Sequence, residues 1–459
     1  MSNATRRIGC RGRVRSATTA MTVAVIGLLS FAPPSGAADL SDLLRRFQDK
    51  QAGAPSVDAA PPLSREEAAQ LWDAFLTAVV KRAGQDSAQE ELRDDLLALL
   101  LDQRHEIVAT LAKATVDAPP WLAAQFGSSW ERLDPLLDRV ATQLEPESAE
   151  KYRRFLQSGR LMNAARAQGW LGDSAATPAR LRELAQAILP KGGADPLAYD
   201  TAVDPELRRV FGFEEPLAPI EESPLLGASP VAARAFGLLA RIAEGAGNWI
   251  VPTASAAASG TEWEALVKRL NNWVPGSQRE LREYLPVVRD MLDGTAHKVA
   301  ERKLPSEHFE IFRDLVATTA WQESCWRQFE KRAGRVATVQ GPGPSYGLMQ
   351  VNARVWRGLF DSKSVSHDIG YNSKAGAEIL YTYFRKHALR AKEHMAPGGE
   401  DNLARATWAA YNGGPGHLRR YRKAGTSPHL KAVDTEFWQK FQAVQRGDDS
   451  AFFSCAVKG

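Results

Sequence analysis

A single glutamate in the C-terminal third of the chain is the strongest candidate for chemistry. Glu323 lies near the end of a segment that begins at Ser306 and has apolar residues at helical spacing, and Trp321 and Trp326 flank it. A carboxyl group in apolar surroundings is poorly solvated when charged, so its pKa rises and it stays protonated near neutral pH, as a general acid requires. Because a lone glutamate on a helix is usually an ordinary surface residue, the interpretation depends on the motifs around it.

Two further motifs follow Glu323 along the chain. The first is the run Ser-Tyr-Gly-Leu-Met-Gln-Val-Asn, residues 345–352, directly after a loop rich in glycine and proline. The second is Ala-Tyr-Asn-Gly-Gly-Pro-Gly, residues 410–416, at the end of a helix expected from Asp401 to Tyr411. Taken singly, Met349 is typical of a core residue and the glycine run of a helix stop. It is their order along the chain that makes the set specific.

Together the motifs Glu-Ser, Gly-Leu-Met-Gln and Ala-Tyr-Asn-x-Gly-Pro-Gly resemble the soluble lytic transglycosylase (SLT) domain, over roughly residues 306–425. This is a goose-lysozyme-like helical family that acts on peptidoglycan. Asn372, Gly376 and Leu380 match the family's Asn-x3-Gly-x3-Leu segment. The resemblance implies that the protein is an enzyme, a carbon–oxygen lyase that binds peptidoglycan glycan strands, and it implies no metal or other cofactor.

The resemblance also implies a mechanism with one carboxyl group. Glu323 protonates the glycosidic oxygen of the β-1,4 bond between N-acetylmuramic acid and N-acetylglucosamine. It then acts as a base on the muramyl C6 hydroxyl, which attacks C1 of the same sugar and forms a 1,6-anhydro product. Because no water is consumed, this reaction needs no second carboxylate, unlike that of ordinary glycosidases.

Carried over by position, the resemblance implies a substrate-binding set around Glu323. Ser324 supports the loop that holds the catalytic residue, the Met-Gln pair of the second motif lines the sugar cleft, and Tyr411 lies close to the carboxyl group. The complete expected set is Ser324, Ser345, Gly347, Met349, Gln350, Asn352, Tyr411 and Asn412.

The pattern departs from that of the family in three places. The interval from Glu323 to Gly347 is longer than usual and contains a basic run, residues 331–335. A serine that the family often places in this interval, in contact with the catalytic carboxyl group, has no aligned counterpart, and Ser345 is the candidate substitute. In the third motif, Asn-Gly-Gly replaces the more usual Asn-Ala-Gly.

Helical spacing of apolar residues dominates the chain, and strand-like alternation is nearly absent. Ser64 and Ser306 are expected N-caps, the first opening the helical region and the second opening the helix of Glu323. The pattern predicts an all-α protein with a lysozyme-like helical catalytic domain at the C-terminus, preceded by an α-helical N-terminal region. The expected segments are a signal peptide (1–37), a linker with a short helix (38–64), a helical N-terminal domain (65–213), a linker with intermediate helices (214–300), the catalytic domain (301–445) and a tail (446–459).

Residues 1–37 have the features of a secretory signal. Arginines without any acidic residue precede an apolar run, and a small-x-small site ends at Ala37. The run is shorter than the ~20 residues that span a bilayer. We therefore expect cleavage near Ala37, a periplasmic protein, and no transmembrane segment after the signal is removed. A retained N-terminal anchor is the alternative, and the choice between Sec and twin-arginine export stays open.

The chain contains three cysteines, and removal of the leader leaves Cys325 and Cys455. In an oxidising compartment two such thiols can pair, so we expect a Cys325–Cys455 disulfide that ties the C-terminal tail to the catalytic domain. The alternative is two unrelated thiols. The sequence has no Cys-x-x-Cys pair or Cys/His cluster, which argues against a structural zinc site.

Charge is distributed unevenly along the chain. The formal net charge is +4, but residues 301–459 carry 24 basic and 16 acidic side chains, whereas residues 38–300 are acidic overall. A basic catalytic region suits a substrate that bears carboxylates, and a solvated basic face is an equal alternative. No recognisable nucleic-acid-binding module accompanies the basic residues, so we expect no nucleic acid partner.

Two other functions fit part of the pattern. One is a hydrolytic muramidase or chitinase on the same fold, which needs a second carboxylate, with Asp361 and Asp368 as the nearby candidates. The other is a non-catalytic peptidoglycan-binding scaffold whose helical N-terminal region recruits a protein partner. The sequence leaves open whether cleavage is endo or exo, which peptide stems are accepted, the oligomeric state, and the role of residues 38–300.

Overall fold

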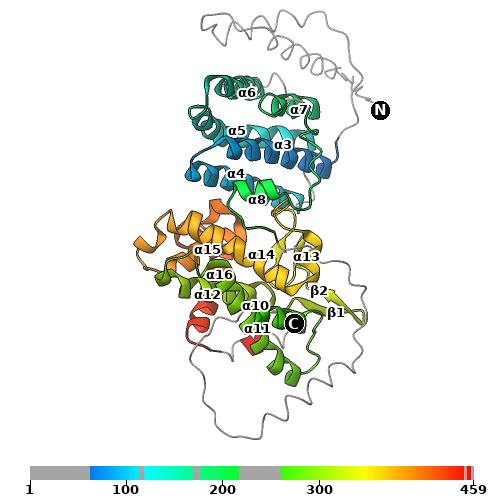
Figure 1. The fold of residues 1–459 in the computed structure, drawn as a ribbon, viewed down its shortest axis with the longest axis vertical. Helices are drawn as coiled ribbons and strands as arrows, with labels where there is room; N and C mark the ends of the chain where they lie inside the picture. The colour runs from blue at the N-terminus through cyan, green and yellow to red at the C-terminus, as the bar shows by residue number, and fades with distance from the viewer. Residues whose placement is uncertain are drawn as a thin grey trace, which may run out of the picture. The chain divides into compact units, whose positions relative to one another are not determined.

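The computed structural model describes residues 63–112, 118–168, 176–190, 192–216, 260–448 and 452–455. The expected signal peptide and parts of the two expected linkers lie outside these residues. The described residues form two compact units (Figure 1), and the boundary along the chain falls between Asp200 and Thr201. Residues 201–213, which the sequence pattern assigns to the N-terminal domain, lie in the second unit, where Arg208 forms a buried ion pair with Glu378 at 2.9 Å.

The first unit is helical, as the sequence predicts. Its helices are α3 (Arg65–Asp86), α4 (Glu90–Leu111), α5 (Ala118–Ala141), α6 (Pro146–Ala167) and α7 (Pro178–Gln186). Helix α3 begins at the expected cap, Ser64. The hydroxyl oxygen of Ser64 accepts a hydrogen bond from the Glu67 N–H at 3.2 Å, and the Glu67 carboxylate accepts one from the Ser64 N–H at 2.8 Å. This reciprocal capping box satisfies backbone donors that the first turn of a helix leaves unpaired.

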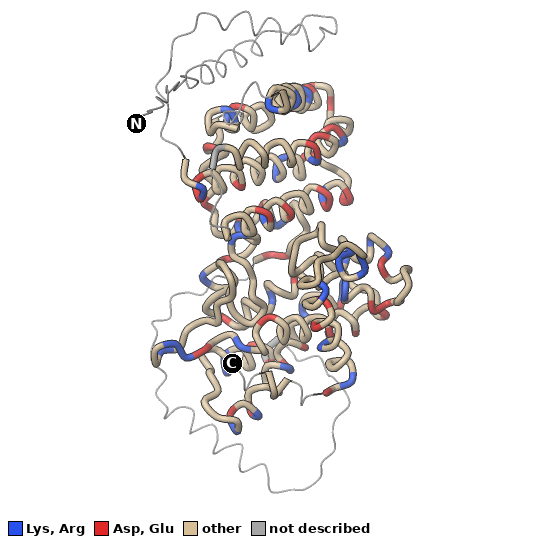
Figure 2. The backbone as a smooth tube through the Cα atoms, turned by 180° about the vertical axis from the view of Figure 1, so that it is seen from behind, with Lys and Arg blue, Asp and Glu red and all other residues tan. Residues whose placement is uncertain are grey.

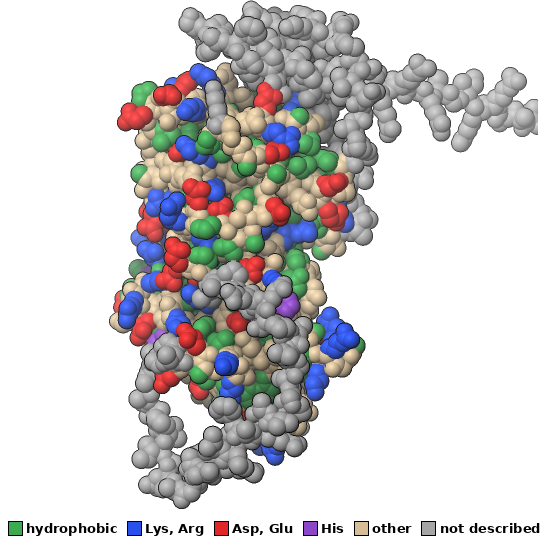
Figure 3. Space-filling model, turned by 45° about the vertical axis from the view of Figure 1, so that its right-hand side comes forward, with side chains coloured by type: hydrophobic (Ala, Val, Ile, Leu, Met, Phe, Trp, Pro, Cys, Tyr) green, Lys and Arg blue, Asp and Glu red, His purple; other side chains and the backbone are tan. Residues whose placement is uncertain are grey.

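A row of aromatic side chains fills the core of the first unit. Trp72, Phe126, Trp130 and Phe155 are buried, and the ring centroids of successive members lie 6.2, 5.5 and 5.5 Å apart. Such contacts add to the stabilisation that burial of the rings provides. On the face seen in Figure 3, acidic and basic side chains of this unit are interspersed. A protein partner for this unit stays a prediction.

The second unit contains the expected catalytic region, and the all-α class is confirmed. In it, α12 packs against α11, α14, α15 and α16, so the helix that carries Glu323 lies at the centre of the unit. No helix in the described ranges is long and apolar enough to cross a membrane. The helices are α8 (Pro205–Val210), α10 (Gly260–Leu270), α11 (Gln278–Ala300), α12 (Ser306–Ser324), α13 (Ser362–His367), α14 (Ile369–Tyr383), α15 (Asp401–Gly413) and α16 (Pro428–Gln445), with short π or 3-10 segments at η3 (Phe384–Leu389), η4 (Glu393–Met395), η5 (Pro415–His417) and η6 (Arg420–Arg422).

Helix α12 begins differently from the expectation. Pro305 occupies the N-cap position with φ −55° and ψ 142°, and Ser306 is already the first helical residue. The expected Ser306 cap is therefore wrong. A proline suits this position because its ring holds φ near −65° and because it has no N–H that would need a partner. Phe312, Leu315 and Val316 then bury one face of the helix completely.

Helices α10 and α11 lie in a stretch that the sequence pattern describes as linker and intermediate helices. In the structure they are part of the second unit. The Asn271 amide donates to the Asp368 carboxylate at 2.7 Å and accepts from the Ile369 N–H at 2.9 Å. The Tyr284 hydroxyl donates to the carbonyl of Trp326 at 2.9 Å, just beyond the end of α12. These bonds attach α10 and α11 to both sides of the catalytic region.

A β-hairpin interrupts the helices after α12, and the sequence pattern does not predict it. Strands β1 (Phe329–Arg332) and β2 (Arg335–Thr338) pair antiparallel, with Arg332 opposite Arg335. The turn residues Ala333 and Gly334 have φ of 51° and 77°, the positive values of the type I′ turn that suits a two-residue hairpin. Strands this short show too little alternation to be recognised. The hairpin carries the basic run of the sequence, and Figure 2 shows its tip in blue. A second, smaller pair consists of β3 (Ser345–Tyr346) and β4 (Val351–Asn352).

Candidate active site

Glu323 is the penultimate residue of α12. The residue as a whole is intermediate in exposure, neither fully buried nor fully exposed. The protein packed around the carboxyl group desolvates it and raises its pKa to about 8, an increase that the ammonium group of Lys440 opposes. The group is therefore mostly protonated at neutral pH. Access combined with a weakly solvating environment is the state that a general acid needs.

The chain turns sharply directly after Glu323. Cys325 and Trp326 have φ of 53° and 61°, the left-handed region that helices usually end on with glycine. The Cys325 N–H donates to the Trp321 carbonyl at 3.0 Å, and the Trp326 N–H donates to the Ala320 carbonyl at 3.3 Å. Two successive non-glycine residues in this conformation cost on the order of 1–2 kcal/mol each. Contacts from elsewhere in the unit must therefore hold the turn.

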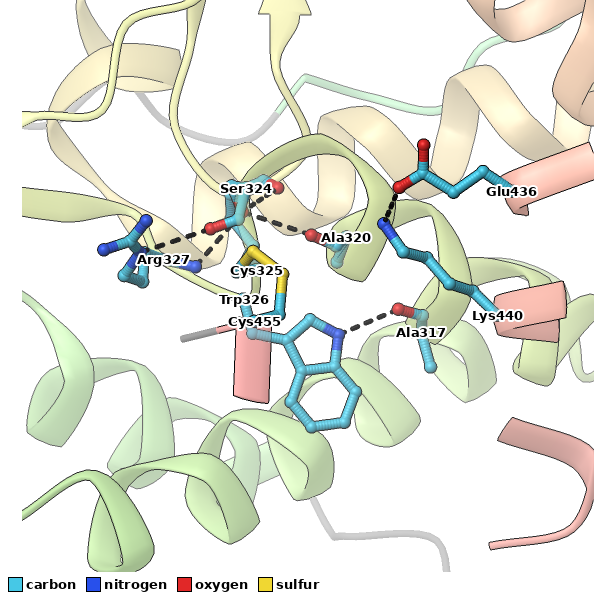
Figure 4. Close-up of a disulfide and its surroundings, with 10 residues drawn as sticks. Ala317, Ala320, Ser324, Cys325, Trp326, Arg327, Glu436, Lys440 and Cys455 are labelled. Carbon is cyan, nitrogen blue, oxygen red and sulfur yellow. Dashed lines mark hydrogen bonds and ion pairs between the residues drawn. A yellow bond between two sulfur atoms is a disulfide. The ribbon is translucent and has the colours of Figure 1, made fainter. Parts of the chain in front are cut away.

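Ser324 connects the end of α12 to the second motif. Its hydroxyl donates to the Leu348 carbonyl at 2.7 Å and lies 3.2 Å from the Ala320 carbonyl, and its oxygen accepts from the Arg327 N–H at 3.1 Å. Figure 4 shows Ser324 between Ala320 and Arg327, next to Cys325. A buried serine with these three contacts joins the helix end to the loop that follows β3.

Two buried amide side chains hold the loop of residues 347–350. The Gln328 amide oxygen accepts from the Leu348 N–H at 2.7 Å, and the Asn372 amide oxygen accepts from the Met349 N–H at 2.8 Å. Both residues are fully buried. The amide nitrogens donate to backbone carbonyls of the neighbouring segments, including that of Val365. Asn372 belongs to a recognised motif, whereas Gln328 carries no sequence signal and is identified only by these contacts.

Glycine at two positions makes room for this arrangement. Gly347 has φ of 75°, and a Cβ there would collide with the side-chain amides of Gln328 and Asn372. Gly376, one turn after Asn372 on α14, faces Met349, and a Cβ there would lie 2.6 Å from the Met349 Cβ. The Asn-x3-Gly spacing therefore lets one face of α14 bind the Met349 backbone and accommodate its side chain.

Tyr411 brings α15 to the same loop. Its hydroxyl donates to the Met349 carbonyl at 2.6 Å. Burial raises the pKa of Tyr411 well above its ordinary value, and the negative charge of Glu323 raises it further, so the two groups lie within electrostatic reach of each other. The hydroxyl stays protonated at any working pH and keeps donating this bond.

The remaining expected residues lie around this centre. The exposed Asn412 accepts from Arg420 at 3.0 Å, and Arg420 forms a buried two-bond ion pair with Asp434 of α16. Asn352 donates to the Ser345 hydroxyl at 3.1 Å. Within the described chain Ser345 makes no hydrogen bond to Glu323, so the geometry gives no support to Ser345 as a contact of the carboxyl group. Gln350 has φ of 47° and donates to the Gly347 carbonyl at 2.8 Å, which closes the loop on itself.

Residues 304–432 match the family model of the transglycosylase SLT domain. This part of the chain is an SLT domain. The resemblance seen in the three motifs is thereby confirmed, and the family's action on peptidoglycan gives the substrate class of the domain. No curated protein and no solved structure matches the chain.

Both acidic residues considered as partners of Glu323 serve as helix caps in the SLT domain. The Asp361 carboxylate accepts from the Ser364 N–H at 2.7 Å at the start of α13. The Asp368 carboxylate accepts from the Tyr371 N–H at 2.6 Å at the start of α14 and from the Asn271 amide at 2.7 Å. Both carboxylates are therefore engaged in holding the first turns of helices.

Parts of the chain outside the SLT match also reach the end of α12. The expected disulfide between Cys325 and Cys455 is present, with Cα atoms 5.7 Å apart. Lys440 lies on α16 beyond residue 432, with its ammonium group 2.8 Å from Glu436 and 5.6 Å from the centre of the Trp321 ring. Figure 4 shows the disulfide and Lys440 at this end of the helix. The sequence offers no motif that would point to Lys440.

Proposed function

We propose that the protein is an exported, periplasmic peptidoglycan lytic transglycosylase in which Glu323 is the catalytic acid and base. It cleaves the β-1,4 bond between N-acetylmuramic acid and N-acetylglucosamine. The Glu323 proton passes to the glycosidic oxygen as the bond to C1 breaks. The resulting carboxylate then takes the proton of the muramyl C6 hydroxyl, whose oxygen bonds to C1 and gives the 1,6-anhydro product. Glu323 gives up one proton and takes one back, so it ends the reaction in its starting state and no water is consumed.

The state of Glu323 carries this proposal. A carboxyl group with a pKa near 8 holds its proton at neutral pH, and once ionised it is a stronger base than an ordinary glutamate. Its partial exposure allows a sugar oxygen to approach. One group can therefore perform both proton transfers.

The surrounding contacts support the division of roles. Ser324, Tyr411, Gln328 and Asn372 all bind the backbone of residues 346–349, so they position the wall beside Glu323. Asn412 is different, because it is exposed and its oxygen alone is engaged, by Arg420. Its amide N–H groups are available to a sugar hydroxyl or N-acetyl group.

A hydrolase on the same fold is less consistent with these contacts. Water-consuming glycosidases need a second carboxylate to activate water or to form a covalent intermediate. Asp361 and Asp368 are both committed to helix N-termini by short hydrogen bonds. Freeing either of them would expose backbone N–H groups that it now satisfies.

Digestion of purified peptidoglycan sacculi in water enriched in oxygen-18 tests the proposal. Release of 1,6-anhydro-muropeptides without the heavy isotope is the expected result, whereas reducing ends that carry oxygen-18 would establish hydrolysis. Glu323→Gln should lower the rate by about 10²–10⁴-fold. The matched control is Glu310→Gln, an exposed glutamate of the same helix, which should keep the parent rate. A Glu323→Gln protein that releases muropeptides as fast as the parent would overturn the assignment of Glu323 as the catalytic group, and a parent that releases no product would leave only the non-catalytic scaffold.

A further inference from the structure

The last described residues of the chain lie against the catalytic helix. Residues 452–455 form one helical turn, beyond the end of the SLT match at residue 432. Cys455 is bonded to Cys325, which follows Glu323 by two positions. We call the two residues of this turn that face the end of α12, Phe452 and Cys455, the clamp.

Phe452 gives the clamp a second attachment. Its ring is buried, and its centroid lies 4.2 Å from that of Trp321 and 4.2 Å from that of Trp326. These two tryptophans flank Glu323, one before it in the last turn of α12 and one after it. The clamp therefore holds the segment around Glu323 on both sides, by contacts between aromatic rings and by a covalent bond.

The segment that the clamp holds needs external support. Cys325 and Trp326 both have positive φ, a conformation that survives in non-glycine residues only where surrounding contacts determine it. Two hydrogen bonds also hold Trp326 in place. Its indole N–H donates to the Ala317 carbonyl at 2.8 Å, and its carbonyl accepts from the Tyr284 hydroxyl at 2.9 Å. Both tryptophan rings also contact the Phe452 ring, so loss of the clamp would remove contacts from each end of the turn.

We propose that the clamp is an oxidation-dependent positioning device, which brings Glu323 into its productive geometry only once the Cys325–Cys455 disulfide has formed. The proposal rests on the lytic transglycosylase activity proposed above. Its physical basis is that a misplacement of about 1 Å at a reacting group lowers a rate by about a hundredfold. A chain that is still reduced would therefore have little activity, and it would gain activity in an oxidising compartment.

The activating step is a thiol–disulfide exchange. The Cys325 and Cys455 thiols lose two protons and two electrons and form one sulfur–sulfur bond. A disulfide-bearing oxidant accepts them and leaves as two thiols. Oxidised glutathione can supply this chemistry in the test.

The test uses the full chain with Cys10→Ser, so that Cys325 and Cys455 are the remaining cysteines. The reduced protein should release anhydro-muropeptides about ten- to a hundredfold more slowly than the oxidised protein, with kcat reduced and KM nearly unchanged. Oxidised glutathione should restore the rate, except in Cys455→Ser. Phe452→Ala should lower kcat even in the oxidised protein. The matched control is Phe453→Ala, whose ring contacts Arg282 of α11 instead of the tryptophans and whose loss should leave the rate unchanged.

A pH profile separates positioning from general stability. The rates are measured well below the melting temperature of each protein. If the clamp holds Glu323 in its desolvated site, the high-pH limit of activity should shift to lower pH in Cys455→Ser. Equal rates and equal pH profiles of oxidised and reduced protein would overturn the proposal. If the oxidised parent itself releases no product, the proposed function fails instead. The clamp is then judged by infrared titration of the Glu323 carboxyl band, assigned with Glu323→Gln, which must differ between the two redox states.

Discussion

Replacement of Lys440 by methionine should move the high-pH limit of activity upward. Lys440 is the charged group that opposes the rise in the pKa of Glu323. Its ammonium group lies 5.6 Å from the Trp321 ring and 2.8 Å from the Glu436 carboxylate. Methionine keeps most of the length and the apolar stem of the lysine while removing its charge, and it leaves Glu436 in a largely exposed position.

The size of the effect follows from the charges. With a pKa of about 8 the Glu323 carboxyl is mostly protonated at neutral pH, and the active acid form falls tenfold for each pH unit well above 8. At an effective dielectric constant of about 20, a unit cation roughly 10 Å from a carboxyl group stabilises its charged form by on the order of 1–2 kcal/mol. Removing this cation should therefore move the high-pH limit of activity upward by about one pH unit.

Initial rates of muropeptide release, measured from about pH 5 to about pH 10, provide the assay. Lys431→Met is the matched control, because Lys431 lies on the same helix and its ammonium group donates to the Ala424 carbonyl. The high-pH limit of activity of Lys431→Met should coincide with that of the parent. The reasoning is refuted if the high-pH limit of activity in Lys440→Met stays in place or moves to lower pH. It is also refuted if the high-pH limit of the parent lies near 4.5, the pKa of an unperturbed glutamate.

Variants of the loop and its supports give the remaining predictions. Asn372→Ala leaves the Met349 N–H without its 2.8 Å acceptor and should lower the free energy of unfolding by about 1–3 kcal/mol in chemical denaturation; an unchanged midpoint would contradict this. Tyr411→Phe removes the 2.6 Å bond to the Met349 carbonyl and should lower kcat about tenfold, with a loss of about 1–3 kcal/mol in the free energy of unfolding because the buried carbonyl loses this donor. Gly376→Ala places a Cβ 2.6 Å from that of Met349 and should destabilise the protein by about 1–3 kcal/mol in calorimetry. Glu323→Gln should become more stable relative to the parent as the pH rises from 4.5 to about 8. The folded parent holds the Glu323 proton more tightly than the unfolded chain does, and the parent loses this stabilisation between these two pH values, whereas glutamine does not titrate. A difference in melting temperature that is independent of pH would exclude this linkage.

Local patterns in the sequence determined much of this protein. Helical periodicity and a capping serine at Ser64 predict the helices of the first unit, because both depend on neighbours a few positions away. The order of the Glu-Ser, Gly-Leu-Met-Gln and Tyr-Asn motifs identifies the SLT domain. If the expected leader with Cys10 is removed, two cysteines remain, and the sequence therefore predicts the Cys325–Cys455 bond that the structure contains.

The same local patterns fail where the deciding contact is distant. The β1–β2 hairpin depends on a two-residue turn and four-residue strands, too short for alternation to be recognised. Gln328 becomes a loop support only because the fold brings Leu348 to its amide oxygen. A lone glutamine has many possible partners, and its sequence position does not select one.

Tertiary structure alone decided the state of Glu323. The residue type and its tryptophan neighbours indicate a possible acid, but the pKa of a carboxyl group depends on how much protein surrounds it and which charges face it. The cation that opposes the rise belongs to Lys440 of α16, more than a hundred residues further along the chain. Lys440 and Phe452 lie outside the family domain, and neither residue type nor spacing marks them. Desolvation and electrostatic fields are sums over space, so only the folded chain brings together the groups that set them.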